Sequence, residues 1–349
     1  MRFIIVGFVN GTGNFLEHHV VRGLPTVLVL VAITAALGWW AWSAKLPVDV
    51  AQNSQQLVAT HVDLNRLRLM TANIRFSDPQ DGENIWPKRR ELLVKTMLKY
   101  DPDLIACQEV TPTQGAYLIK ELAAWYTHYP RAGVGNVEGD QGRLVGAVNE
   151  TFTSLNTLFY KTDRFDQIDG SAGLVLPGQL QEVPAENTFY TLAVLRERQT
   201  AANQPAKTWI TVDTHLRHQE KFAEQCAEAL RIKINDTLKK YPHSGVIVMG
   251  DMNHDRTSGM YHIMTEGLPA DGLGPLVDTY DYSKKSPQEA WGNYHAFTGK
   301  PQSEWPTDFI FSATGWKSDG AQIVHDQGLD GRWPSDHFLV LTELRNQQD

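Results

Sequence analysis

The sequence predicts an α/β domain that follows a single transmembrane helix, and three observations support this fold class. The chain has 349 residues, of which 42% are hydrophobic, enough to bury a sizeable core. From residue 66 onward, short apolar runs alternate with longer segments of helical period, as in α/β proteins. One uncharged apolar stretch near the N-terminus stands apart from this pattern. We therefore expect residues 66–349 to form one domain of catalytic size.

The apolar stretch runs from Leu24 to Ala44 and contains no charged residue. Because roughly 20 apolar residues cross the hydrocarbon core of a bilayer, this stretch is predicted to be a transmembrane anchor. Trp39, Trp40 and Trp42 lie near one end, and tryptophan rings favour the membrane interface. The chain is therefore expected to be attached to a membrane through this helix.

Two other interpretations of the apolar stretch are open. A cleaved signal peptide could use Ala41 and Ser43 as its small-residue cleavage site, although 23 preceding residues are long for such a signal. The second interpretation is a helix that is buried in the core of the protein. We retain the uncleaved anchor, with an N-terminal segment at 1–23, the anchor at 24–44 and a linker at 45–65.

Basic residues on the two sides of the anchor predict its orientation. Arg2 and Arg22 precede the span and Lys45 follows it closely. The positive-inside rule then favours a cytoplasmic N-terminus. The expected arrangement is a single-pass membrane protein whose main domain lies on the periplasmic or extracytoplasmic side.

The net charge and the cysteines limit the possible partners and cross-links. The formal net charge is −8, and tight contact with a polyanion needs Lys or Arg to neutralise phosphates. Nucleic acid is therefore a possible partner that the charge does not favour. The two cysteines, Cys107 and Cys226, make no disulfide framework. Cys107 is expected to be a buried hydrophobe, and a bridge between the two is left open.

Each element of the domain is predicted from its local pattern. Strands are expected where short apolar runs end at polar or turn residues, and helices where apolar residues recur with helical spacing. Pro87, for example, fits the first turn of a helix whose apolar face includes Leu93 and Met97. In chain order, the predicted elements are strand Leu67–Ala72, helix Pro87–Tyr100, strand Asp103–Cys107, helix Pro112–Ala124, strands Asn156–Tyr160, Phe189–Glu197 and Thr208–Thr214, helix Glu220–Leu238, strand Val246–Met249, helix Ser258–Glu266, and strands Asp308–Phe311, Ala321–His325 and Phe338–Leu344.

The most informative polar motif is Gly250-Asp251-Met252-Asn253, which follows the apolar run Val246–Met249. Strand ends that open into loops are where α/β proteins usually build their sites. A carboxylate and an amide two residues apart suit a hard cation or a phosphate oxygen. The tetrapeptide alone is equally typical of an ordinary turn, but other strands end in polar clusters as well.

Glu109 follows the second predicted strand and would suit a Mg²⁺-type ion, which takes one or two carboxylates and keeps several waters. His215 and His218 follow another strand, but zinc is disfavoured because no Cys or His cluster matches their spacing. A histidine bound to a phosphoryl oxygen fits better. Before the last strand, Asp336 and His337 are adjacent and would point to opposite faces of an extended chain.

Taken together, these clusters resemble the endonuclease/exonuclease/phosphatase superfamily of deoxyribonuclease I-like, metal-dependent phosphoesterases. The resemblance covers roughly residues 66 to 345 and implies a two-sheet, four-layer α/β sandwich with its site at one rim of the sheets. The clusters that carry it are, in chain order, Asn73, Gln108-Glu109, Thr214-His215-Leu216, Gly250-Asp251-Met252-Asn253, Asp308-Phe309-Ile310 and Ser335-Asp336-His337.

The resemblance also implies a role for each of these side chains around a divalent ion, Mg²⁺ or alternatively Mn²⁺. The metal ligands would be Glu109, with Asn73 and Asp336 beside it. The catalytic groups would be Asp251 on the attacking water, Asn253 and His215 on the phosphate, and His337 oriented by Asp308. His218 and His295 are further candidates for substrate binding.

The sequence departs from the family pattern at two places. Family members commonly carry an Arg two residues before the Asp that corresponds to Asp308, and Pro306 stands there. Many also carry an acidic partner for the first histidine just before the strand Asn156–Tyr160. Here the nearest acid is Glu150, which leaves the group that orients His215 undetermined.

The expected activity is hydrolysis of phosphoester bonds, with phosphodiesters preferred, through in-line attack of water. The alternatives are a nuclease that acts on DNA or RNA, a sphingomyelinase-like lipid phosphodiesterase, and an inactive binding module on the same fold. A module without activity should have lost metal or histidine positions, and all of the implied positions are filled.

Overall fold

The computed structural model describes residues 62–130, 155–176, 188–199, 205–268, 272–284 and 292–346. The predicted N-terminal segment, the predicted anchor and the linker up to residue 61 lie outside the described residues. Within the described ranges, no helix is long and apolar enough to cross a bilayer. The anchor therefore stays a prediction from sequence.

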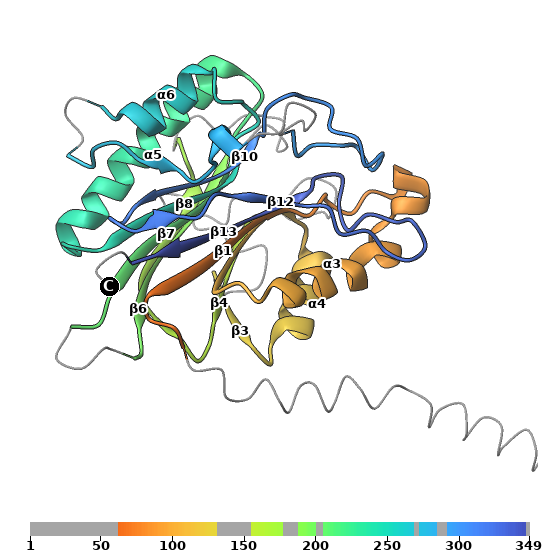
Figure 1. Cartoon of the computed structure of the whole chain (residues 1–349), viewed down its shortest axis with the longest axis horizontal. Helices are drawn as coiled ribbons and strands as arrows, with labels where there is room; N and C mark the ends of the chain where they lie inside the picture. The colour runs from red at the N-terminus through yellow and green to blue at the C-terminus, as the bar shows by residue number, and fades with distance from the viewer. Residues whose placement is uncertain are drawn as a thin grey trace, which may run out of the picture. The chain divides into compact units, whose positions relative to one another are not determined.

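Two mixed β-sheets form the framework of the domain (Figure 1). The first has the strand order β11-β13-β1-β2-β4-β3, and β12 also pairs with β13. Its β1 and β2 run parallel, whereas its other neighbours are antiparallel. The strands of this sheet are β1 (Arg66–Asn73), β2 (Leu104–Val110), β3 (Tyr126–Tyr129), β4 (Leu155–Lys161), β11 (Lys317–Ser318), β12 (Gln322–Val324) and β13 (Leu339–Arg345).

The second sheet has the order β5-β6-β7-β8-β10-β9. Its β7 and β8 run parallel, and its other neighbours are antiparallel. The strands are β5 (Phe165–Leu174), β6 (Phe189–Glu197), β7 (Thr208–His215), β8 (Gly245–Asp251), β9 (Val277–Asp278) and β10 (Asp308–Ala313).

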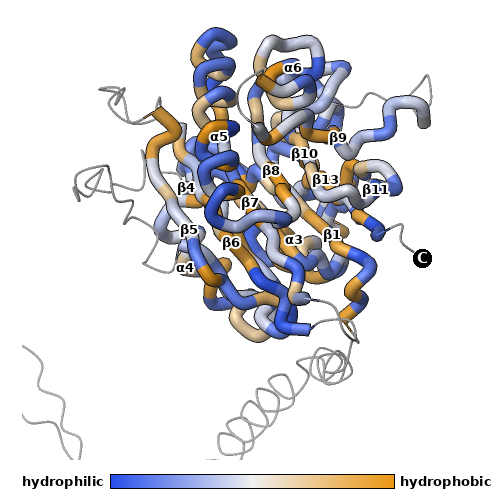
Figure 2. The backbone as a smooth tube through the Cα atoms, turned by 90° about the vertical axis from the view of Figure 1, so that its left-hand side faces the viewer, coloured by the Kyte–Doolittle hydropathy of each residue, from blue (hydrophilic) through white to orange (hydrophobic). Residues whose placement is uncertain are grey.

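Apolar side chains from both sheets share one core between them. This core includes Leu69 and Leu104 from the first sheet and Val212 and Val248 from the second, all at most 1% exposed. Figure 2 shows hydrophobic residues along the strands β1 and β8. Burial of such side chains stabilises a fold by roughly 1.5–3 kcal/mol each. The packing of the two sheets therefore holds their strand ends in register across the sandwich.

Helices cover the outer faces of the two sheets, so the domain has four layers (Figure 1). A second core lies between the first sheet and its helices and includes Met70, Leu93 and Leu118. The capping box of Thr111 starts the second helix, as its sequence suggests. The helices are α3 (Trp86–Tyr100) and α4 (Pro112–Leu122) on the first sheet, α5 (Glu220–Lys240) and α6 (Gly259–Glu266) on the second, and the short 3-10 helices η1 (Pro79–Asn84) and η3 (Tyr282–Lys284).

The predicted α/β class and the two-sheet sandwich are confirmed, and the predicted helices lie within a few residues of the observed ones. Sequence analysis missed the strands β3, β5, β9 and β11. The strand β5 is a case in point, because Gly170 and Gly173 interrupt its apolar pattern and most of its residues are only half-buried. Edge strands of this kind bury little surface and so leave a weak sequence signal.

The disulfide that the sequence left open is not formed. Cys107 and Cys226 are both free and fully buried. Cys107 packs in the core beneath the helices of the first sheet, whereas Cys226 belongs to the core that includes the second sheet and α5. Each therefore serves as a small apolar side chain.

Candidate active site

Strand direction brings the polar clusters to one end of the sandwich. The parallel strands β1 and β2 end at Asn73 and just past Glu109, and the parallel pair β7 and β8 ends at His215 and Asp251. The strand β10 runs antiparallel to β8, with its first residue, Asp308, directly opposite Asp251. The strand β13 is likewise antiparallel to β1 and begins just after the Asp336-His337 pair.

Asn73 links the two sheets at this end. Its Nδ2 donates to Oε1 of Glu109 at 3.1 Å and to Oδ2 of Asp251 at 2.9 Å. Its backbone carbonyl accepts a hydrogen bond from the hydroxyl of Ser335 at 2.7 Å. Three segments that are far apart in sequence therefore meet at one buried amide.

Asp251 is a nearly fully enclosed carboxylate, at 1% exposed. Its Oδ1 accepts the backbone N–H of Asn253 at 2.8 Å, and its Oδ2 lies 3.5 Å from Nε2 of His215 and 3.8 Å from Nε2 of His337. Burial alone would raise the pKa of Asp251, but the two histidines and the hydrogen bonds from Asn73 and Asn253 outweigh it and lower the pKa. Asp251 is therefore a carboxylate at neutral pH.

His337 lies between two carboxylates. Its Nδ1 is 2.9 Å from Oδ2 of Asp308, and its other nitrogen faces Asp251. Burial would lower the pKa of His337, but the charges of Asp308 and Asp251 outweigh burial and raise the pKa to about 10. Burial and the negative charge of Asp251 raise the pKa of Asp308. The ring of His337 therefore carries a positive charge at neutral pH.

Asn293 completes this chain of hydrogen bonds, and sequence analysis did not single it out. It is fully buried, and its Nδ2 donates to the same Oδ2 of Asp308 that His337 contacts. Its Oδ1 accepts the backbone N–H groups of Thr307 at 2.9 Å and Asp308 at 3.3 Å. Asn293 lies in a loop, outside any apolar periodicity, so only its contacts identify it.

Glu109 and Asp336 are placed to hold a divalent cation. Glu109 has a left-handed backbone (φ 61°), and its Oε2 accepts the N–H of Phe76 at 2.9 Å. Burial raises the pKa of Asp336, and the negative charge of Glu109 contributes to the rise. The negative charge of Glu109 thus disfavours ionisation of Asp336, and a nearby cation would favour it. Carboxylate oxygens are the ligands that Mg²⁺ or Mn²⁺ takes, whereas the amide oxygen of Asn73 accepts the backbone N–H of Arg75 at 3.0 Å.

A second group of possible ligands, Asp251, Asp308 and His337, brings its ligand atoms within 4.8 Å of one another. Both ring nitrogens of His337 face carboxylates, and its raised pKa keeps both nitrogens protonated. A protonated nitrogen has no lone pair for a metal. The arrangement fits a hydrogen-bonded Asp-His-Asp chain better than a metal centre.

His215 and Asn253 contact each other beside Asp251. The Nδ2 of Asn253 donates to the carbonyl of Leu216 and to Nε2 of His215, both at 2.8 Å. Glu150, the nearest acid that the sequence offered as a partner for His215, lies outside the described residues.

Two side chains from the helices fix the loops that carry the site. Arg89 of α3 is fully buried and donates to the carbonyls of Ile74 at 2.5 Å, Arg75 at 2.6 Å and Pro334 at 3.2 Å. Gln114 of α4 donates to the carbonyl of Arg75 at 2.7 Å. These contacts connect the loop after β1 with the loop before β13.

The two remaining candidate histidines differ in their surroundings. His218 is exposed and lies two residues before α5, and its role in substrate binding stays a prediction. His295 is fully buried, with its ring stacked on Phe338 at 3.9 Å and against Trp333 at 5.2 Å. Burial lowers the pKa of His295 to about 4, so it is a neutral core residue rather than a substrate contact.

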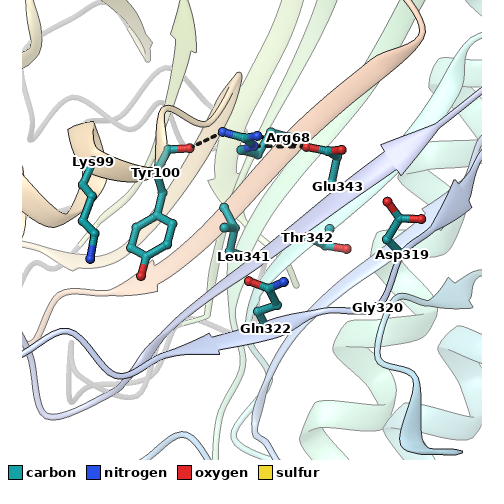
Figure 3. A pocket seen from close by; sticks show the side chains of 9 residues that line it. All are labelled: Arg68, Lys99, Tyr100, Asp319, Gly320, Gln322, Leu341, Thr342 and Glu343. Atoms are coloured by element: carbon teal, nitrogen blue, oxygen red, sulfur yellow. Dashed lines mark hydrogen bonds and ion pairs between the residues drawn. The ribbon is translucent and has the colours of Figure 1, made fainter. Parts of the chain in front are cut away.

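A pocket elsewhere on the domain carries no comparable chemistry (Figure 3). It lies at the opposite end of the first sheet, where Arg68 near the start of β1 pairs with Glu343 near the end of β13. Arg68 donates to Glu343 at 3.0 Å and to the carbonyl of Tyr100 at 2.8 Å. Lys99 pairs with Asp326. Most charged groups of this pocket therefore form ion pairs with neighbouring charged groups.

The fold and this strand-end site define a phosphoesterase-type α/β sandwich, and the sequence comparison agrees. A model of the Endonuclease/Exonuclease/phosphatase family matches residues 70–337. The chain belongs to the endonuclease/exonuclease/phosphatase family, whose members are hydrolases acting on phosphoester bonds. Among curated protein sequences, none shows significant similarity to the chain.

Solved structures of this family share the fold. The mannosyl-6-phosphatase of Bacteroides thetaiotaomicron is 19% identical with a TM-score of 0.62, and the alignment covers 80% of this chain and 100% of that one. A family member from Bacteroides vulgatus is 22% identical with a TM-score of 0.62, over 81% and 99% of the two chains. The human nocturnin catalytic domain with bound sulfate is 17% identical with a TM-score of 0.58, over 82% and 95%.

Proposed function

We propose that this protein hydrolyses phosphodiester bonds with the help of a divalent cation, Mg²⁺ or Mn²⁺, by in-line attack of water. The observation that carries the proposal is the chain of contacts from Asp308 through His337 to Asp251, which Asn73 extends to Glu109. In this proposal, Asp251 positions the water, His337 supplies positive charge, and Glu109 belongs to the metal-binding set. In-line displacement at phosphorus needs these three functions.

Glu109, Asn73 and Asp336 would hold the cation. When bound, it would supply positive charge for the phosphoryl oxygens and help to orient the attacking water. All other functions fall to side chains of this protein.

Asp251 is the group that accepts a hydrogen bond from the attacking water and aligns it with phosphorus. Its lowered pKa makes it a weak base, so positioning rather than full deprotonation is its main contribution. His337 is protonated and donates to the phosphoryl oxygens or to the leaving oxygen as negative charge develops there. Asp308 holds the ring of His337 in this orientation, as Asn293 holds Asp308. His215 and Asn253 bind the phosphate from the other side.

The charge of the site supports a diester over a monoester. Four carboxylates converge here, and the two arginines closest to them are already engaged, Arg75 with Asp81 and 4.0 Å from Asp336, and Arg89 with backbone carbonyls. A phosphomonoester would bring about two negative charges to this environment at neutral pH, whereas a diester brings one. The net charge of −8 argues against nucleic acid as the preferred substrate and leaves lipid or small-molecule diesters in favour.

We further propose that the uncharged segment 24–44 anchors the protein in a membrane and presents the domain on the extracytoplasmic side. The support is the length and composition of that segment and the tryptophans at its end. Fractionation of cells that express the full chain, followed by protease treatment of intact cells, tests both the attachment and the side of the membrane.

The activity is tested with the full-length protein on an aryl phosphodiester, an aryl phosphomonoester, DNA and sphingomyelin, with Mg²⁺, with Mn²⁺ and with a chelator. We expect the aryl phosphodiester to be hydrolysed with either metal, and the chelator to abolish the activity. Asp251→Ala should lower kcat by about 10³-fold or more, while the thermal stability of the variant shows that it folds. Turnover that resists both the chelator and the substitution would exclude this mechanism.

A further inference from the structure

Arg256 occupies an unusual position beside the site. It lies in the loop after β8, three residues past Asn253, and is only half-buried. Its guanidinium carbon is 4.1 Å from the centre of the Tyr282 ring and 5.1 Å from that of Trp305. It makes no hydrogen bond or ion pair with any residue that the structure describes. A guanidinium with five N–H donors is thus held by two rings while its donors stay available.

The rings beneath Arg256 are held firmly in place. The hydroxyl of Tyr282 donates to Oδ2 of Asp278 at 2.8 Å, and Trp305 packs edge-on against Tyr282 at 5.7 Å. Tyr280 stacks on Tyr282 at 5.7 Å. A side chain that rests on a preorganised support loses less entropy when it binds a ligand.

The same aromatic residues also contact the start of the strand that carries Asp308. The hydroxyl of Tyr280 donates to the backbone carbonyl of Asp308 at 3.2 Å. The N–H of Met252 donates to the carbonyl of Thr307 at 2.8 Å, which ties the loop of Arg256 to the loop of Trp305. Three residues of extended chain span at most about 10 Å. Arg256 is therefore within reach of a group that neighbours the phosphate being cleaved.

Two other arginines at this end, Arg75 and Arg89, differ from Arg256 in that their N–H donors are already engaged. Arg75 pairs with Asp78 and Asp81, and Arg89 is buried among backbone carbonyls. Burial raises the pKa of Asp278 and the positive charge of Arg256 acts to lower it, while the N–H donors of the Arg256 guanidinium stay available. Guanidinium groups bind phosphate and carboxylate oxygens in a bidentate manner.

We propose that Arg256 binds a second anionic oxygen group of the substrate, next to the phosphoester that is hydrolysed. This inference rests on the proposed function for the cleaved bond but concerns a separate contact. The shared chemistry is an additional phosphate or carboxylate on the alcohol part of the substrate. Such a group can belong to a nucleotide chain or to a phosphorylated small molecule.

The test compares matched substrates with the full-length protein. One pair is a dinucleotide with and without a terminal phosphate, and the other is an aryl hexose phosphodiester with and without a second phosphate on the hexose. The aryl phosphodiester serves as the substrate without a second anion. Each pair represents one class of substrate, a nucleotide chain or a phosphorylated small molecule. For the class that the enzyme uses, we expect Arg256→Ala to raise KM by about 10-fold or more for the member with the extra phosphate. Its kcat and the kinetics on the aryl diester should stay unchanged.

Three variants separate binding from structure. Arg256→Lys keeps the charge and should recover part of the loss, and Arg256→Gln replaces Arg256→Ala if the latter fails to fold. Arg90→Ala is the matched control, because Arg90 also lies over a ring, that of Tyr117 at 4.6 Å, but on α3. An equal loss on all substrates, or no loss on either pair, would overturn the proposal.

A binding measurement keeps this test independent of the catalytic one. Inorganic pyrophosphate is titrated into the protein in the presence of a chelator, with affinity followed by calorimetry. We expect Arg256→Ala to weaken binding about 10-fold and Arg90→Ala to leave it unchanged. If the protein hydrolyses none of the substrates, this measurement alone decides, and an affinity that does not depend on Arg256 refutes the inference.

Discussion

The carboxylate of Asp308 shows how one buried residue can organise a site. Its Oδ2 receives hydrogen bonds from His337, Asn293 and the hydroxyl of Thr307, whereas its Oδ1 has no partner among the described residues. Isolated burial of such a charge would be unfavourable, and the protonated His337 compensates for it. The pair therefore exists as a unit, and removal of one partner leaves the other with an uncompensated charge.

Asp308→Asn tests this pairing. The amide still fits the space but cannot stabilise the imidazolium, so the pKa of His337 falls and its ring is free to adopt the other tautomer. We expect kcat to fall by about 10²–10⁴-fold with little change in KM, measured on the aryl phosphodiester. Asp278→Asn, at a half-buried carboxylate of the second sheet, is the control for folding. Unchanged turnover in Asp308→Asn would show that His337 needs no partner.

The linear pattern indicated the strand-end residues of the site, both charged and amide, but not Asn293. Glu109, Asp251 and His337 stand directly after or before apolar runs, and such a strand-end position is visible in a linear pattern. Asn293 has no such neighbour, and its importance comes only from the three groups that it contacts. His295 shows the converse, because a histidine near the site in sequence proved to be a core residue.

At the scale of elements, the pairing of β7 with β8 sets the position of the catalytic carboxylate. Gly250 lies opposite Thr214 in this parallel pair, directly before Asp251. A Cβ at Gly250 would lie 1.9 Å from the backbone oxygen of Thr214, and its φ of 153° is one that other residues rarely adopt. Only glycine therefore allows the strand to pass Thr214 and still present Asp251 at its end.

Gly250→Ala should consequently damage both the fold and the site. The clash involves backbone on both sides and cannot be relieved by rotation of a side chain, so we expect a destabilisation of about 1–3 kcal/mol. Denaturant unfolding measures this loss, and kcat should fall as well because Asp251 is displaced. Gly315→Ala is the control, since Gly315 also has a positive φ but no atom within 4 Å of the added Cβ. Equal effects of the two substitutions would contradict this account.

At the scale of the whole molecule, the packing of two sheets concentrates charge in a buried place, and stability should depend on pH as a result. The pKa of His337 rises from an ordinary value of 6.5 to about 10 on folding. The folded state thus holds this proton more tightly than the unfolded state. The stabilisation is fully present below about pH 6.5 and is lost as the pH rises through about 10.

We therefore expect the free energy of unfolding, measured with a chelator present, to fall between pH 7 and pH 10. The His337 contribution should reach up to about 1.4 kcal/mol per pH unit. Its size is the difference between the wild-type protein and His337→Gln, in which this proton is absent. Parallel stability curves for the two proteins would mean that the His337 pKa is the same folded and unfolded.

The two cysteines give a second test of the whole fold, because they lie in different cores. Burial raises the pKa of both thiols, that of Cys226 to about 12, so neither forms a reactive thiolate at neutral pH. A thiol reagent should label neither in the native protein and both after denaturation, without prior reduction. A requirement for reduction before labelling would reveal the disulfide that the structure does not contain.

The sequence by itself determined the types of most elements, the family and the strand-end carboxylates and histidines, because apolar periodicity and the residues that interrupt it are local properties. The tertiary structure decided which of these groups meet. It joined Asn73 to Asp251 across two sheets, buried His295, and brought Arg256 onto the rings of Tyr282 and Trp305. Such contacts depend on how separate segments pack, and packing between distant segments leaves no regular pattern along the chain.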